Sequence, residues 1–211
     1  MDEDFSFNVK KERPEEQYEN VWDYFKGERL KQYALSKNIQ RIQTRITARA
    51  LELLDIKKRD ALLLDAGCGP GFASFYLKER GYKVLSMDII SQFLYYYNTN
   101  ETNFLSGDMC YPPLRSNTLD GIISISALQW VYRNPNSMEM KNNFISLLTS
   151  FYNILKPNSS TIFQFYPKND SILSHMKNII NSSSNFNGGF HIDHPNNPKK
   201  RRIFLKLIKE Y

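Results

Sequence analysis

The feature that most constrains this chain is an apolar run that leads directly into a glycine-rich turn. Residues 62–64 are leucines, and they are followed by Asp65 and then by Gly67, Gly69 and Gly71. An uninterrupted apolar run is typical of a strand covered on both faces of a parallel sheet. Glycines let the backbone approach a ligand closely, because they carry no Cβ atom. The pattern predicts an α/β fold with a ligand-binding loop after its first strand.

The spacing of these loop residues narrows the class of ligand. A dinucleotide fingerprint would read Gly-x-Gly-x-x-Gly, and a phosphate-binding P-loop would end in Lys-Ser or Lys-Thr. The loop here has neither pattern. Asp65, two residues before the first glycine, suits a ligand that carries a cationic group. The alternative for the glycines alone is a tight strand-to-helix turn without a ligand.

Composition indicates one globular domain with a basic surface. The chain has 211 residues, of which 41% are hydrophobic and 24% charged, with a formal net charge of +6. No apolar run approaches the about 18 residues of a membrane span, and no secretory signal is seen, so we expect a soluble intracellular protein. The basic segment 199–202 suits a polyanion such as nucleic acid, although a solvated basic face has the same composition.

The pattern along the chain predicts alternating helices and strands. We interpret residues 1–17 as a mobile acidic leader, 18–55 as N-terminal helices, and 61–211 as a sheet core. After the first strand, the expected strands are 83–87, 104–108, 121–125, 161–165 and 203–208; the expected helices are 72–80, 91–98 and 142–155, and 182–189 is expected to be a loop. This alternation favours a parallel α/β sheet.

Acidic residues follow three successive expected strands. Asp65, Asp88 and Asp108 each lie at a strand end, and Asp88 comes 19 residues after Gly69. An acid at about this spacing accepts hydrogen bonds from ribose hydroxyls in nucleotide-binding folds. Asp108 is placed to accept from an adenine amino group, with Met109 packed on the ring. Each acid alone could be a helix cap or turn residue, but together they predict a nucleoside site.

Three further segments make the chain resemble a known family. The glycine loop with Asp88 and Asp108 looks like that of class I S-adenosylmethionine-dependent methyltransferases. Segments 49–54 (Arg-Ala-Leu-Glu-Leu-Leu), 123–130 (Ile-Ser-Ile-Ser-Ala-Leu-Gln-Trp) and 164–170 (Gln-Phe-Tyr-Pro-Lys-Asn-Asp) resemble the Williams–Beuren-type small-subunit rRNA (guanine-N7)-methyltransferases of eukaryotes and archaea. The resemblance runs from about Tyr33 to the C-terminus.

The resemblance implies a doubly wound, mostly parallel seven-stranded sheet with N-terminal helices. It also implies S-adenosyl-L-methionine as cofactor and transfer of its methyl group to N7 of a guanosine in small-subunit rRNA. The implied cofactor-binding residues are Asp65, Gly67, Gly69, Asp88, Ile89, Asp108, Met109, Ser124 and Tyr33. The resemblance further implies a small zinc-binding activator subunit, paired with the sheet edge near 103–106 and the aromatic run 93–97.

The chemistry of the residues is consistent with this implied reaction. Guanine N7 carries a lone pair and no proton, so its methylation needs no general base. Segment 124–130 lacks the prolines and acid typical of exocyclic-amine methylation. The chain also lacks the paired nucleophilic cysteine used for C5-pyrimidine methylation, because Cys68 lies inside the glycine loop. We therefore expect no catalytic residue. We expect Trp130 and Tyr166 to orient the base, and Gln129 or Asp170 to read its Watson–Crick edge.

The sequence leaves other substrates and one other function open, and it predicts no metal site. A tRNA base or a small molecule is an alternative substrate on the same fold, and a ribosome-assembly factor that mainly binds pre-rRNA is an alternative of another class. His191 and His194 lack a third ligand at zinc spacing, so no metal site is expected. The location would be the cytoplasm in an archaeon, and the nucleus and cytoplasm in a eukaryote.

Overall fold

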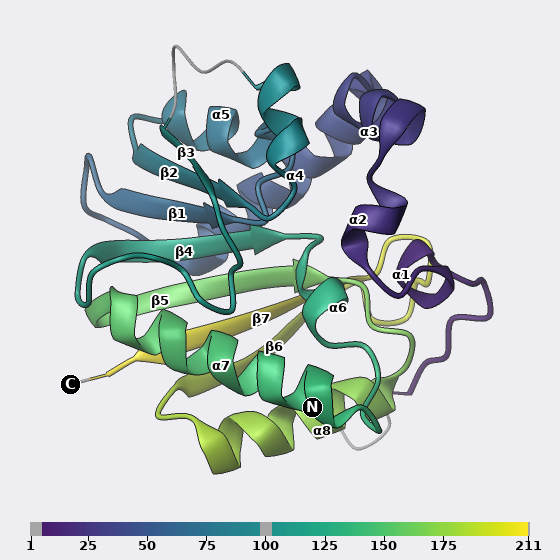
Figure 1. Ribbon diagram of the computed structural model, residues 1–211. Helices are drawn as coiled ribbons and strands as arrows, with labels where there is room; N and C mark the ends of the chain where they lie inside the picture. Colours follow the sequence, from purple (N-terminus) through teal and green to yellow (C-terminus); the bar gives the residue numbers. More distant parts are fainter. Residues whose placement is uncertain (1–5, 98–102, 211) are drawn as a thin grey trace.

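The computed structural model describes residues 6–97 and 103–210 and contains one seven-stranded sheet with helices on both faces (Figure 1). The helices are α1 (Pro14–Gln17), α2 (Val21–Tyr24), α3 (Gly27–Ala34), α4 (Lys37–Leu54), α5 (Phe72–Lys78), the 3₁₀ helix η1 (Ser91–Tyr96), α6 (Leu128–Val131), α7 (Met138–Ile154) and α8 (Asp170–Ser183). The strands are β1 (Leu62–Ala66), β2 (Lys83–Asp88), β3 (Asn103–Ser106), β4 (Leu119–Ile125), β5 (Leu155–Phe165), β6 (Asn187–Asp193) and β7 (Arg202–Lys209).

The strand order is β3-β2-β1-β4-β5-β7-β6. β1 to β5 run parallel to one another, while β7 is antiparallel to both β5 and β6. The doubly wound, mostly parallel sheet predicted from the sequence is confirmed. The chain direction across the sheet reverses between β1 and β4, which is the switch point where open α/β sheets bind ligands at the carboxyl ends of their strands.

The two faces of the sheet bury two separate cores. Successive strand residues alternate between them, because side chains along a strand point to opposite faces. Leu63 packs with Ile46 and Ala50 of α4, whereas Leu64 packs with Phe144 and other residues of α7 and α8. Because both faces of β1 are covered, neither face requires polar residues, which explains the run of leucines.

Strand β6 and helix α6 are elements that the sequence did not reveal. We expected a loop at 182–189, but α8 extends to Ser183 and β6 begins at Asn187. Gly188 and Gly189 made this segment look like a turn, yet it is paired along its length with β7. His191, expected in a surface loop, lies within this strand.

Residues 6–17 pack against the body of the molecule, which differs from the expected mobile leader. Phe7 is buried, and the Val9 amide donates to the Lys168 carbonyl at 2.9 Å. The Arg13 guanidinium donates to the carbonyls of Tyr166 and Pro167. One aromatic and one guanidinium anchor this segment, despite its polar composition. The boundary at residue 18 stays a prediction, and residues 1–5 lie outside the described residues.

Within the described part of the chain, none of the helices combines the length and the apolar character needed to span a bilayer.

Candidate functional site

The glycine loop closes against the second strand at the carboxyl edge of the sheet. The amides of Gly67 and Cys68 donate to the Met87 carbonyl at 2.8 and 3.0 Å. Gly67 has a φ of +75°, and a Cβ added there would lie 2.5 Å from the Cβ of Ala127. Only glycine satisfies both the backbone angle and this close approach. The loop therefore holds its amides at a fixed place above the ends of β1 and β2.

Asp88 is buried at the end of β2 and is bound to the glycine loop. Its Oδ2 accepts from the Gly69 amide at 2.7 Å and its Oδ1 from the Ile90 amide at 2.8 Å. Burial raises the pKa of this carboxyl to about 6, while the amide donors act in the opposite direction. The carboxylate is thus held in one orientation at the edge of the pocket.

Asp65 ends a buried chain of hydroxyl groups beneath the loop. The Ser74 hydroxyl donates to Asp65 Oδ2 at 2.5 Å and lies 2.7 Å from the Ser86 hydroxyl, and the Tyr97 hydroxyl donates to Ser86. Burial raises the pKa of Asp65 to about 7, and the nearby Asp88 acts in the same direction. Such a carboxyl is more readily ionised when a cationic group binds beside it.

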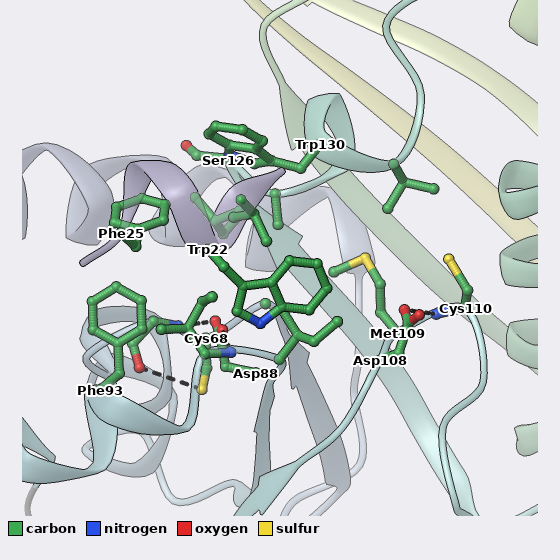
Figure 2. A pocket seen from close by; sticks show the side chains of 18 of the residues that line it. Trp22, Phe25, Cys68, Asp88, Phe93, Asp108, Met109, Cys110, Ser126 and Trp130 are labelled. Atoms are coloured by element: carbon green, nitrogen blue, oxygen red, sulfur yellow. Dashed lines mark hydrogen bonds between the residues drawn. The ribbon is translucent and has the colours of Figure 1, made fainter. Parts of the chain in front are cut away.

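Around these residues lies a cavity of about 360 Å³. Figure 2 shows the Trp22 side chain pointing into the cavity, which Phe25 and Phe93 also line. Asp108 and Met109 line the cavity from the segment after β3, where Asp108 Oδ1 accepts from the Cys110 amide at 2.8 Å. The cavity combines carboxylates, backbone amides and aromatic rings, which suits a ligand with a polar sugar and a flat base.

A second cavity of about 480 Å³ adjoins the first, and Glu19, Arg133 and Met140 line both. It lies at the ends of β4 and β5, where Gln129 and Tyr166 line it, together with Arg13 and Glu15 from the N-terminal segment. Trp130 lines the first cavity. The two aromatic residues that we expected to orient one base therefore line neighbouring cavities.

The chain is similar in sequence to known proteins. A methyltransferase-domain family model matches residues 64–163. The chain is 32% identical over 190 residues to the 18S rRNA (guanine-N(7))-methyltransferase of Mus musculus, an alignment that covers 88% of this chain and 67% of the mouse protein. The chain belongs to this methyltransferase family.

Other comparisons agree with this family and fold. The 18S rRNA (guanine-N(7))-methyltransferase RID2 of Arabidopsis thaliana is 33% identical over 87% of this chain, which spans 65% of that relative's length. A structure of an S-adenosyl-L-methionine-dependent methyltransferase from Methanococcus maripaludis has a TM-score of 0.66 at 14% identity, covering 87% of this chain and 93% of that one. A methyltransferase in complex with the Haloferax volcanii Trm112 activator has a TM-score of 0.59 at 12% identity, covering 86% and 98%.

Most cofactor-binding residues expected from the family resemblance line the first cavity. They are Asp65, Gly67, Gly69, Asp88, Ile89, Asp108, Met109 and Tyr33. Ser124 does not: it is fully buried in β4, its hydroxyl has no hydrogen-bond partner within the described residues, and Ser126 lines the cavity instead. Ser124 lies inside β4, whereas Ile125 ends the strand and Ser126 follows it with a φ of +60°, and these two residues reach the cavity. The binding roles themselves stay predictions.

Asp170 lies outside both cavities in this member of the family. Its carboxylate accepts from the Phe7 amide at 3.3 Å and from the Ser6 hydroxyl at 3.5 Å, and the neighbouring Asn169 caps α8 through the Ile172 amide. These contacts give Asp170 a role in holding the N-terminal segment. Of our two candidates for reading a base edge, the structure brings only Gln129 to a cavity.

Sequence reasoning missed the contribution of the N-terminal segment to both cavities. Trp22 and Phe25 line the first, and Glu15 lines the second. The available signal was the aromatic density between residues 18 and 25, which is high for a surface segment. Across the described ranges 6–97 and 103–210, His, Cys, Asp and Glu form no group of three that could hold a metal.

Proposed function

We propose that the chain transfers a methyl group from S-adenosyl-L-methionine to N7 of a guanosine in small-subunit rRNA. The main support is that the glycine loop, Asp88 and Asp108 line one cavity. This cavity adjoins a second one at the ends of β4 and β5. The names of the eukaryotic relatives support both the position of the methyl group and the class of RNA. Because these relatives are eukaryotic, we also propose the nucleus and cytoplasm as the location.

The residues of the first cavity fit the cofactor. Asp88 would accept from the ribose hydroxyls, because each of its oxygens has a further lone pair beyond the amide bond that it accepts. Asp108 would accept from the adenine amino group, with Met109 against the ring. Asp65 and the glycine-loop amides would hold the amino acid portion. When bound, the cofactor supplies an electrophilic methyl group on a sulfonium.

The protein's part in the reaction is to position the base and exclude water. No proton leaves N7, so proximity and in-line orientation account for the rate. Burial raises the pKa of the Cys68 thiol well above its ordinary value, and also that of the Cys110 thiol, so neither is a thiolate nucleophile. This chemistry supports a transfer without a covalent intermediate, as N7 methylation requires.

Basic residues near the second cavity support an RNA substrate. Arg13, Arg133 and Lys168 line that cavity. The Arg201 guanidinium lies 5.0 Å from the Phe7 ring centre, which brings the β6–β7 loop to the N-terminal segment, on the same side of the molecule as α1 (Figure 1). Lys199 and Lys200 on this loop are exposed. A phosphate backbone could bind here while one base enters the cavity.

We also propose an activator subunit that pairs with β3. β3 is an edge strand, and Tyr95 of η1, the helix before β3 in the chain, is 87% exposed. The resemblance in fold to a methyltransferase in complex with an activator supports the idea. The aromatic run contributes less surface than we expected, because Phe93 and Tyr97 are buried. Co-expression with a zinc-binding activator should improve soluble yield; a fully active monomer purified alone would contradict this partner.

The reaction itself is tested with purified protein, alone and with the activator. The assay supplies methyl-labelled S-adenosyl-L-methionine and small ribosomal subunits from cells that lack the enzyme, and then analyses nucleosides. Labelled 7-methylguanosine is the expected product. Label in another nucleoside would instead support a different methyltransferase. Subunit binding without any label would support an assembly factor.

A further inference from the structure

The second cavity contains two polar side chains that are almost completely withdrawn from solvent. Glu15 of α1 and Gln129 of α6 are each only 6% exposed, and both line the cavity. They come from segments more than a hundred residues apart, and the fold brings both to this cavity. Burying polar groups is costly unless hydrogen-bond partners compensate for the lost water. The pair therefore indicates a site that is completed by a ligand.

The side-chain hydrogen bond of Gln129 uses its donor and leaves its acceptor atom without a partner in the described part of the chain. Its Nε2 donates to the Ser126 carbonyl at 2.8 Å, which fixes the orientation of the amide. Its Oε1 is buried and has no hydrogen-bond partner among the described residues. Buried acceptors of this kind are rare in native proteins, and a bound molecule is one of the explanations for them.

Glu15 differs from its neighbour Glu16 in the side-chain partners of its carboxylate. The Glu16 carboxylate contacts Lys168 Nζ at 2.7 Å and accepts from the Arg13 amide at 2.9 Å. Across residues 6–97 and 103–210, the Glu15 carboxylate has no ion pair or hydrogen bond to another side chain. Burial raises the pKa of Glu15, and the charges of Arg13 and Arg133 act in the opposite direction. The cavity thus holds a carboxylate that bonds to its own backbone amide and is attracted by two guanidinium groups, without a side-chain partner within the described ranges.

The two acceptors match the Watson–Crick edge of guanine. That edge presents the N1–H and the N2 amino group as adjacent donors, whereas adenine presents an acceptor at N1. Arg13 and Arg133 line the same cavity and carry donors for the guanine O6 atom. Tyr166 provides an aromatic wall, with the Arg13 guanidinium 5.6 Å from its ring centre. A guanine held by this edge keeps its N7 atom free, because N7 lies on another edge of the base.

A carboxylate at this edge would also favour the transferred state. The N7 lone pair forms the new N7–CH₃ bond while the S–CH₃ bond breaks, and its electron pair stays on sulfur. The positive charge thereby moves from the sulfonium to the purine, and no proton is transferred. The N1–H and N2 amino groups become stronger donors as that charge develops. A hydrogen bond to Glu15 then strengthens on the way to the transition state, which is the condition for catalysis by binding.

We propose that Glu15, with Gln129, selects guanine in the second cavity by accepting hydrogen bonds from its N1–H and N2 amino groups. This proposal rests on the proposed function. It assigns base selection to Glu15 of α1, and Trp22 of the next helix, α2, lines the cofactor cavity. One short segment would then contact both substrates.

The test compares Glu15→Gln with the wild type and with Glu12→Gln. The control removes the same charge from an exposed residue three positions earlier, which lines neither cavity. Each protein, together with its activator, is assayed for cofactor affinity and for methylation of small-subunit RNA. The RNA carries either guanosine or inosine at the mapped target position. Inosine keeps N7 and O6 but lacks the N2 amino group.

We expect the wild type and Glu12→Gln to prefer guanosine over inosine by at least about tenfold. Glu15→Gln should bind the cofactor as the wild type does, lose on the order of 100-fold in kcat/KM on guanosine, and show almost no preference. An unchanged preference in Glu15→Gln would overturn the proposal. If that variant does not fold, equal wild-type rates on both RNAs would overturn it. A wild type that forms no 7-methylguanosine would instead refute the proposed function.

Discussion

The Asp88 carboxylate accepts a hydrogen bond from the Gly69 amide at 2.7 Å, joining the end of β2 to the loop after β1. The 19-residue spacing seen in the sequence thus becomes a direct contact. The same carboxylate also accepts from Ile90, where the chain turns toward η1. Asp88 therefore holds two walls of the first cavity together. Its replacement should affect both ligand binding and the shape of the loop.

Asp88→Asn should weaken S-adenosyl-L-methionine binding by about 1–3 kcal/mol, because charge-assisted hydrogen bonds to the ribose are lost. Isothermal calorimetry measures the affinity. Asp60→Asn is the matched control, since Asp60 is an exposed acid paired with Lys83 away from the cavity. Equal affinities for the wild type and Asp88→Asn would contradict the assignment of Asp88 to the ribose.

The ligand-free protein should lose stability as pH rises. Burial raises the pKa of Asp65 to about 7 and that of Asp88 to about 6, from 3.8 in the unfolded chain. The folded state therefore binds protons more tightly, so this contribution is complete below about pH 4 and is lost as pH rises to about 7. The thermal midpoint should be higher at about pH 5.5 than at about pH 8.

Asp65→Asn should reduce this difference between the two pH values, because the residue can no longer titrate. Groups whose pKa is lowered, such as Asp120 and Glu16, are already ionised at about pH 5.5 and do not contribute to it. A midpoint that rises with pH in the wild type would contradict the buried acids.

Gly71→Ala should destabilise the fold more than Gly81→Ala does. The two glycines have nearly the same φ, +87° and +86°, so the backbone strain of an alanine is matched. A Cβ at Gly71 would collide with the Tyr97 ring, whereas one at Gly81 meets nothing within 4 Å. We expect the extra loss in free energy of unfolding to be about 1–3 kcal/mol. Equal losses in denaturant titrations would show that the loop adapts without cost.

Replacing Lys199 and Lys200 by alanine should lower the salt dependence of RNA binding. Each lost phosphate contact reduces the slope of log K against log salt by somewhat under about one unit, so we expect a decrease of up to about two. Arg201 is less suitable, because its Nε donates to the Pro195 carbonyl at 2.9 Å. The control is the double variant Lys57→Ala, Arg59→Ala. Both residues are exposed and lie in the loop between α4 and β1, at the amino end of β1. An unchanged slope would identify the Lys199–Lys200 pair as a solvated surface.

The sequence was most informative where local pattern and chemistry coincide. The leucines before Asp65 predicted β1 because burial on both faces allows only apolar residues there, and the glycine loop predicted the first cavity. Strand β6 was missed because Gly188 and Gly189 weaken the strand pattern, while its pairing with β7 is non-local.

The second cavity could not be predicted from local pattern. Glu15 lies in an acidic segment that looks solvated, and Arg133 and Tyr166, which line the same cavity, are far away in the sequence. Asp170 looked like a base-reading residue, but whether it faces a cavity depends on the N-terminal segment that covers it. Contacts between distant segments decide both cases, and a single sequence does not display them.

The most direct measurement of the central claim is a map of N7-methylguanosine in small-subunit rRNA from cells of the source organism. Borohydride reduction followed by aniline cleavage marks such positions. We predict one cleavage site that is present with the wild-type protein, absent when the gene is deleted, and reduced with Asp88→Asn expressed at wild-type level. A cleavage pattern that is the same in all three strains would contradict the account.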